Sequence, residues 1–330
     1  MISTESFEPE TFRHFFGLNE DKDIAFADGM VSALQKIDRG LLPPAAVHPY
    51  AGLISIGTAG VSELIGVVEN GDRQERLDGL DALAHILAYA PASTETLDRL
   101  KQLLNQVGQE GHDDELAALL SKTIALGKDE AFLHAQFVNL ASDDPGLIAT
   151  SARLLGFGKY EPAVPVLNAL VSPERFYESR YVIWALGEIG SDAALPILGY
   201  SLAAGFRAVD CMIAMGKIRD ISSIPKLTPM ILQGLPEQRD AAYRALSMIL
   251  AEHREFVQSL EHTCKEFAQL IIGQFENDRL ELSGSTRFHM ALCLARLGQK
   301  LEIGQLRRYL GTEMDEREAS DMQAFFMRKR

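Results

Sequence analysis

The stretch YVIWALGEIGSDAALPIL, residues 181–198, decides the fold. It predicts a helix, a tight turn and a second helix. Ile183 and Leu186 are three positions apart, so they fall on one apolar stripe of the first helix. Gly190 suits the end of that helix, and Asp192 is placed to cap the next one. The stretch therefore predicts a helical unit.

The same pattern recurs on both sides of this stretch. An apolar residue, a glycine and a later proline recur at separations of 31 and then 29 residues, as Leu155-Gly156 with Pro165, Leu186-Gly187 with Pro196, and Met215-Gly216 with Pro225. Such repeats bury their faces only against their neighbours and form an α-solenoid. We therefore expect an all-α solenoid of stacked antiparallel helix pairs, with second helices over 162–171, 193–204 and 221–232.

A column of small residues runs through the first helices of these repeats. Gly156, Gly187, Gly216 and Ser247 occupy matching positions. Glycine costs about 1 kcal/mol of helix propensity, so its recurrence predicts that neighbouring helices approach each other closely at this column.

The string from Trp184 to Leu198 resembles the HEAT repeat, and closely the HEAT-like subtype named after phycobilisome lyases. By spacing, the clearest repeats cover 151–250, with more distant copies at 53–65 and 294–306. The resemblance implies a solenoid whose second helices line the concave side. It also implies an alternative activity, because relatives of this repeat attach linear tetrapyrroles to cysteines of light-harvesting proteins.

The two ends of the chain differ from the repeats. Residues 1–42 hold a cluster of phenylalanines ahead of a Pro-Pro-Ala-Ala stretch, and residues 313–330 form a charged amphipathic segment. Terminal repeats need a polar cover. We therefore predict N-terminal capping helices over 1–42, the solenoid over 43–312 and a C-terminal capping helix over 313–330.

Composition limits the cellular setting and the partner. No run of about 18 apolar residues occurs, and the acidic start at residues 1–10 does not fit a secretory signal. A bacterial cytoplasmic protein without a membrane anchor is expected. The net charge of −14 opposes binding to nucleic acid and favours a protein partner of basic character.

Catalytic signatures do not stand out in the sequence. Cys211, Cys264 and Cys293 lie apart in apolar contexts, which is typical of buried thiols. The nearest approach to a metal pattern is Glu252-His253 with Glu261-His262, and one helix spanning both pairs would turn them roughly 180° apart. We therefore predict no metal, no cofactor and no catalytic residue.

The predicted second helices carry Lys226 as their only formal charge, so they either line a neutral groove or lie buried between layers. The groove interpretation makes Asn168, Tyr200, Ser201 and Thr228 candidate partner-binding residues. Trp184 is expected to pack in the core.

The predicted function is that of a non-catalytic protein-binding scaffold or adaptor, including an inhibitor or immunity-type protein, which recognises its partner through the concave helix face. Two alternatives stay open: an accessory lyase or chaperone for a tetrapyrrole-bearing protein, and a nucleic-acid-binding solenoid.

Overall fold

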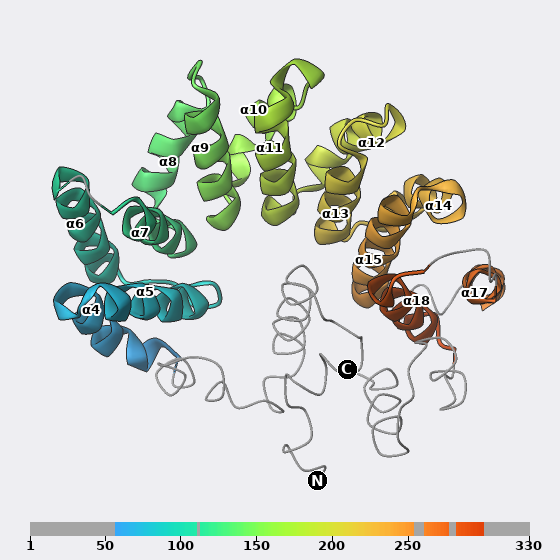
Figure 1. The fold of residues 1–330 in the computed structure, drawn as a ribbon, viewed down its shortest axis with the longest axis horizontal. Coiled ribbons are helices and arrows are strands. Elements are labelled where there is room, and N and C mark those ends of the chain that lie inside the picture. Colours follow the sequence, from blue (N-terminus) through green and yellow to red (C-terminus); the bar gives the residue numbers. More distant parts are fainter. Residues whose placement is uncertain (1–56, 111–112, 254–260, 277–281, 300–330) are drawn as a thin grey trace, which may run out of the picture. The chain divides into compact units, whose positions relative to one another are not determined.

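The computed structural model describes residues 57–110, 113–253, 261–276 and 282–299, and every regular element in these ranges is a helix (Figure 1). The all-α prediction is confirmed. No helix in these ranges has both the length and the apolarity to cross a membrane. The predicted caps at 1–42 and 313–330, with parts of the copies at 53–65 and 294–306, lie outside the described residues, so the predicted domain boundaries stay predictions.

Chain contacts divide the described residues into a first unit, 57–194, and a second unit, 195–299. The first unit contains α4 (Val61–Asn70), α5 (Arg73–Leu87), α6 (Thr94–Glu110), α7 (Asp114–Leu126), α8 (Glu130–Asn139), α9 (Pro145–Phe157), α10 (Val164–Leu170) and α11 (Phe176–Ile189). The second unit contains α12 (Leu195–Ala203), α13 (Ala208–Ile218), α14 (Ile224–Gln233), α15 (Pro236–Glu252), α17 (Glu261–Phe275) and α18 (Gly284–Arg296).

Each unit is built of antiparallel helix pairs in two layers. Odd-numbered α5, α7, α9 and α11 pack successively on one another in the first unit, as do α13, α15 and α18 in the second. We call these the inner layers. Each inner helix is covered by the helix before it: α10 packs on α11, α12 on α13 and α14 on α15. The structure therefore confirms a solenoid of stacked helix pairs.

The predicted grouping of helices within a repeat is wrong. The tight glycine turn was expected to join the two helices of one packed pair, yet α9 and α10 contact each other little, and so do α13 and α14. The turn is a corner between pairs. The closely packed partner of each second helix is the first helix that follows it in sequence.

The predicted location of the second helices on the concave side is also wrong. Within each unit, α10, α12 and α14 lie in the outer layer (Figure 1). Inner helices touch their neighbours closely, whereas α12 and α14 are in little direct contact. Closer spacing in the inner layer bends each unit toward that layer.

The small-residue column explains this close spacing. A Cβ added at Gly156 of α9 would lie 3.0 Å from the Cα of Ala185 in α11, and one added at Gly216 of α13 would lie 2.6 Å from the Cα of Ala245 in α15. The distance at Gly216 is too short for a Cβ, and the one at Gly156 would require the neighbouring helix to shift by a few tenths of an ångström. The prediction that these glycines permit close helix approach is confirmed at both positions.

The corners between pairs follow from local sequence. Gly190 ends α11 in the left-handed conformation, with φ of 80°, as predicted for a helix-terminating glycine. Asp192 is the first residue of a 3₁₀ turn, Asp192–Ala194, that precedes α12, so its predicted role as the cap of that helix is wrong. Equivalent turns, Glu161–Ala163 and Ile221–Ser223, precede α10 and α14.

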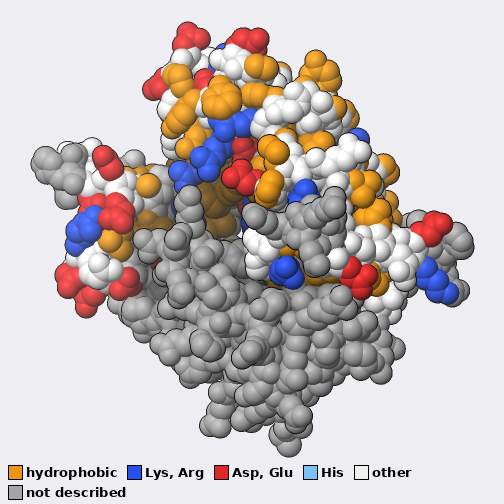
Figure 2. All heavy atoms as spheres, turned by 45° about the vertical axis from the view of Figure 1, so that its right-hand side comes forward, with side chains coloured by type: hydrophobic (Ala, Val, Ile, Leu, Met, Phe, Trp, Pro, Cys, Tyr) orange, Lys and Arg blue, Asp and Glu red, His pale blue; other side chains and the backbone are white. Residues whose placement is uncertain are grey.

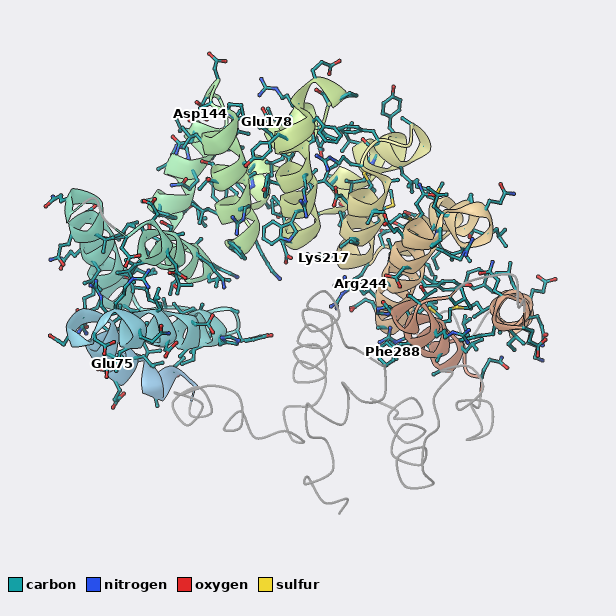
Figure 3. All side chains as sticks on the ribbon, viewed as in Figure 1. Glu75, Asp144, Glu178, Lys217, Arg244 and Phe288 are labelled. Carbon is teal, nitrogen blue, oxygen red and sulfur yellow. The ribbon has the colours of Figure 1, made fainter. Side chains whose placement is uncertain are left out.

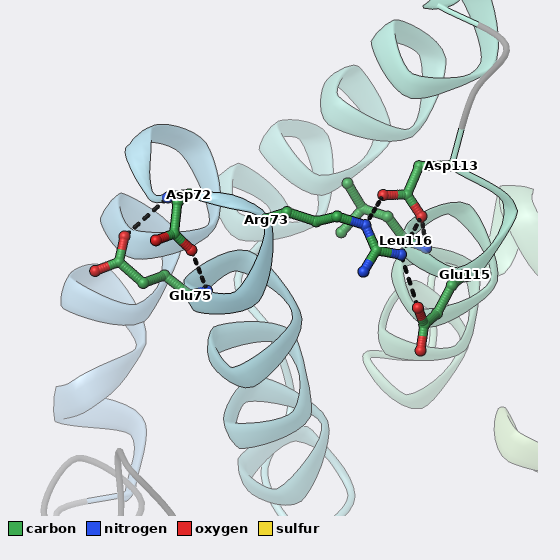
Figure 4. Close-up of polar contacts among 6 residues, drawn as sticks. All are labelled: Asp72, Arg73, Glu75, Asp113, Glu115 and Leu116. Atoms are coloured by element: carbon green, nitrogen blue, oxygen red, sulfur yellow. Dashed lines mark hydrogen bonds and ion pairs between the residues drawn. The ribbon is translucent and has the colours of Figure 1, made fainter.

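Ion pairs tie successive pairs together in the first unit. Arg73 at the start of α5 contacts Asp113, which precedes α7, and Glu115 in the first turn of α7, each at 2.7 Å (Figure 4). Asp113 also accepts a hydrogen bond from the backbone N–H of Leu116, so it caps α7. The hydrogen bond from Arg73 lowers the pKa of Asp113, which keeps this carboxylate charged.

Buried polar contacts link the helices of the second unit. The hydroxyl of Tyr243 in α15 donates to Gln274 of α17 at 3.0 Å, and Gln274 donates to the carbonyl of Ile231 in α14 at 2.9 Å. His289 of α18 contacts the hydroxyl of Ser247 in α15 at 3.3 Å. Burial lowers the pKa of His289 to about 3, so the imidazole is neutral at pH 7.

The glycine contacts generate a prediction about stability. Gly216→Ala places a methyl group against the α15 backbone, and overpacking of this kind costs about 1–3 kcal/mol. Gly273→Ala in α17 is the matched control, because its Cβ would enter open space and gains up to about 1 kcal/mol of helix propensity. Urea denaturation should show the first variant destabilised and the second stabilised. Equal effects would contradict close packing at Gly216.

The buried histidine generates a prediction about pH. Because the pKa of His289 is depressed in the folded state, the unfolded chain binds the extra proton below about pH 6.5, and stability is lost as pH falls from there. By about pH 5 the loss should reach roughly 2 kcal/mol. Denaturation curves of the wild type and His289→Gln should show that the variant lacks this part of the pH dependence. If the stability of both proteins changes with pH in the same way, the assignment of this pH dependence to His289 is wrong.

Candidate binding surface

The four sequence-predicted contact residues lie on outer-layer helices and do not form one exposed surface. Ser201 is only 3% exposed, which contradicts its expected contact with a partner. Asn168 donates from Nδ2 to the carbonyl of Ala193 at 3.0 Å, so its amide holds the corner turn. Thr228 donates its hydroxyl to the carbonyl of Ile224 at 2.9 Å.

Tyr200 is the exception among the four. Its side chain is 74% exposed on α12. Asn168 belongs to the first unit, whereas Tyr200, Ser201 and Thr228 belong to the second. Tyr200 is therefore the one aromatic residue of the predicted groove that is accessible, and it lies on the outer layer.

The inner layer of the first unit presents a different set of side chains. Lys122 of α7, Arg153 of α9 and Trp184 of α11 are separated by 31 residues each, and they occupy equivalent positions on successive inner helices. Arg153 is exposed, and Lys122 and Trp184 are half-buried. The repeat therefore lines up two cations and one indole along the inner layer.

Further aromatic rings surround this line. Tyr177 and Tyr181 lie on the same stripe of α11 as Trp184, because the three positions are four and three residues apart. Phe157 lies one turn beyond Arg153 on α9. We call the six residues the inner-face cluster: Lys122, Arg153, Phe157, Tyr177, Tyr181 and Trp184.

The four rings of the cluster form two contacting pairs. Phe157 meets Trp184 edge to face with ring centroids 4.9 Å apart, and the Lys122 Nζ lies 5.7 Å from the centroid of Phe157. Tyr177 meets Tyr181 edge to face at 5.4 Å. Aromatic pairs in this geometry hold one another in place. Each ring pair is therefore held in place before a partner binds.

Gly156 positions Trp184. A Cβ at Gly156 would lie 2.8 Å from Cζ3 of the indole, so only glycine lets the ring lie across α9. The sequence prediction placed Trp184 in the core, but the residue is half-buried at the edge of the α9–α11 contact. Trp184 therefore packs against α9 and stays partly exposed.

The cluster is electrostatically positive. Within the described ranges, no carboxylate lies at ion-pair distance from Lys122, Arg153 or the exposed Arg180 of α11. The hydrogen bond with Tyr181 raises the pKa of Tyr177, an effect that the charge of Arg153 partly opposes. Tyr177 therefore keeps its phenolic proton at neutral pH.

Basic side chains also lie on the inner side of the second unit, where Figure 3 labels Lys217 on α13 and Arg244 on α15. On the face shown in Figure 2, Lys and Arg side chains lie beside hydrophobic ones. An acidic chain thus presents local basic and aromatic surface.

Reactive groups of the described residues are held in structural roles. Burial raises the pKa of Cys211 and of Cys293 to about 12, so both thiols are neutral and poorly nucleophilic. The side chain of Cys264 lies outside the described residues. No group of three or more His, Cys, Asp or Glu in the described part of the chain is placed to hold a metal ion.

The premise that one helix spans both Glu-His pairs does not hold, because α15 ends at Glu252 and α17 begins at Glu261. Glu252 pairs with Arg219 at 3.1 Å, and His253 contacts the carbonyl of Arg219 at 2.7 Å. These two residues therefore tie the end of α15 to the end of α13.

The sequence analysis did not predict the inner-face cluster, although the repeat spacing indicates it. The 31-residue spacing that aligned the glycines also aligns Lys122, Arg153 and Trp184. Reading the exposed positions of the repeat in the same register would have identified this line.

Comparisons with known proteins agree with the repeat assignment. The family profile of the PBS lyase HEAT-like repeat matches residues 180–199, which confirms the resemblance seen at 184–198. Among curated protein sequences, no relative matches this chain.

Two solved structures are similar to it. The complex of CpcE and CpcF of phycocyanin lyase from Nostoc sp. PCC7120 has a TM-score of 0.41 and 15% identity, over 76% of this chain and 92% of that one. An engineered protein solved by the Northeast Structural Genomics Consortium has a TM-score of 0.41 and 16% identity, over 99% and 95% of the two chains.

Trp184 is the only tryptophan of the chain, so its fluorescence reports on the cluster directly. Iodide should quench this emission about twofold more efficiently than caesium does, because Lys122 and Arg153 attract the anion. Replacing both cations with glutamine should remove the preference, whereas Lys226→Gln on α14 should leave it unchanged. Equal quenching by the two ions in the wild type would contradict a positive, accessible cluster.

Proposed function

We propose that this chain is a non-catalytic protein-binding scaffold or adaptor, and that it recognises its partner through the inner-face cluster of the first unit. The observation that carries the proposal is the line of aromatic rings and cations on α7, α9 and α11, in which the cations have no carboxylate partner among the described residues. Tyr, Trp and Arg are the residue types that contribute most to protein interfaces.

The helical scaffold supports this assignment energetically. The edge-to-face contacts hold the four rings before any partner arrives, so binding does not require these rings to be ordered. Phe176 and Tyr177 at the start of α11 are 60% and 55% exposed, which extends the apolar area next to the cations. Protein segments are suited to a surface that combines apolar area with a few directed charges.

A second candidate function is an accessory lyase or chaperone for a tetrapyrrole-bearing protein. The observation that favours it is the match to the PBS lyase HEAT-like repeat, which covers Arg180, Tyr181 and Trp184. Arginine beside aromatic rings also suits a planar pigment that carries carboxylates. Nucleic-acid binding is the weakest alternative, because the chain carries a net charge of −14.

Affinity capture from the native cells, followed by binding of the purified partner, tests the proposal. Tyr177→Ala and Arg153→Glu should each weaken that binding by about tenfold or more, since both remove an exposed side chain of the cluster. Tyr200→Ala is the matched control for an exposed tyrosine on the outer layer, and it should bind as the wild type does.

The opposite pattern would favour the surface predicted from sequence. Loss of binding in Tyr200→Ala, with Tyr177→Ala unaffected, would move the interface to the outer layer and overturn the proposal. A captured protein with a visible absorbance band, released as pigment, would replace the scaffold function with the tetrapyrrole alternative.

A further inference from the structure

We propose that the inner-face cluster binds an extended acidic segment of its partner protein. In this segment two acidic side chains and then one apolar side chain are spaced three positions apart. The inference rests on the proposed function and names the chemistry that the same surface recognises. It departs from the basic partner expected from net charge, because local charge on the binding surface outweighs the average over the chain.

Some cations of the first unit form ion pairs and others do not. Arg73, Arg99 and Lys101 all form ion pairs at 2.7 Å or less with carboxylates of neighbouring helices. In contrast, Arg153 and Arg180 are exposed and have no carboxylate partner among the described residues. Because both side chains are exposed and lie close to aromatic residues of the cluster in sequence, they are available for an external anion.

Two further cations lie at the ends of the inner helices. Lys128 and Lys159 follow α7 and α9 in the left-handed conformation, with φ of 61° and 52°, and Gly190 has that conformation at the equivalent position after α11. Left-handed geometry is unfavourable for a lysine. A cation at a helix C-terminus gains less from the helix dipole than this geometry costs. The fold alone therefore favours glycine at both sites, and the lysines add positive charge along this edge.

Helix spacing defines the shape of the ligand. Packed helix axes lie about 8–10 Å apart, so equivalent residues on α7, α9 and α11 repeat at that distance. A peptide in the extended polyproline II conformation has three residues per turn and advances about 3.1 Å per residue, so every third side chain lies on the same side and advances about 9 Å. The spacing therefore matches a peptide whose side chains are three positions apart. Two acidic side chains would face Lys122 and Arg153, and an apolar one would face Trp184.

A protein segment fits this face better than a nucleic acid does. Glu188 follows Trp184 by one turn on α11, and Asp78 and Asp81 lie on the neighbouring inner helix α5. These carboxylates would repel a continuous phosphate backbone. A peptide with charges at only two of its positions avoids them.

The test uses the full chain and a dye-labelled peptide of about ten residues, in which glutamate, glutamate and phenylalanine are spaced by Ser-Gly pairs. Binding is read by anisotropy and by the fluorescence of Trp184. We expect Lys122→Gln and Arg153→Gln each to weaken binding about fivefold. Lys226→Gln on α14, which removes the same charge elsewhere, should have no effect, and circular dichroism should confirm folding of all variants.

Three results would overturn the inference: no binding of the peptide, equal binding of a peptide in which glutamine replaces glutamate, or tighter binding of a single-stranded oligothymidine that depends on the same cations. Failure of the proposed function is distinguishable from these results. Binding of the captured partner could still depend on Tyr177 and persist in about 0.5 M salt while the peptide does not bind. In that case the proposed interface is correct, and only the acidic character of its ligand is wrong.

Discussion

The close approach of neighbouring inner helices, made possible by glycine, is the constraint on which the rest of the structure depends. At Gly156 and Gly216 the facing backbone would lie 3.0 and 2.6 Å from an added Cβ, so a larger residue would push the neighbouring helices apart. The outer helices have no such contact and stay further apart, and each unit therefore bends toward its inner layer. Fixed spacing also brings residues 31 positions apart into line on successive helices.

The candidate site is a consequence of the same contact. Because Gly156 has no side chain, the indole of Trp184 lies across α9 and reaches the ring of Phe157, which in turn lies beneath the Lys122 ammonium group. One packing requirement thus positions both the helices and the aromatic surface between them. The cations beside the rings are not needed by this packing, since Arg153 and Arg180 form no ion pair among the described residues. We therefore assign them to recognition.

The sequence predicted the helices, the repeat period, the glycine contacts and the left-handed end of α11, because each depends on residues close together in the chain. The layer of each helix could not be predicted in this way. A helix–turn–helix string satisfies the same periodicity whether the turn joins a packed pair or forms a corner between pairs. The error carried over to the site: Asn168 and Thr228 are polar residues that satisfy backbone groups, and Ser201 is buried. Trp184 was assigned to the core because hydrophobicity alone does not distinguish a ring within the core from one at its edge.

The central claim is that a partner lies against the inner layer of the first unit, and site-specific photo-crosslinking tests it most directly. A photoreactive phenylalanine analogue would replace Tyr177 in one sample and Tyr200 in another, since both tyrosines are more than half exposed. The account predicts that the partner crosslinks from position 177 and not from position 200. Crosslinking from position 200 alone would contradict it and place the partner on the outer layer.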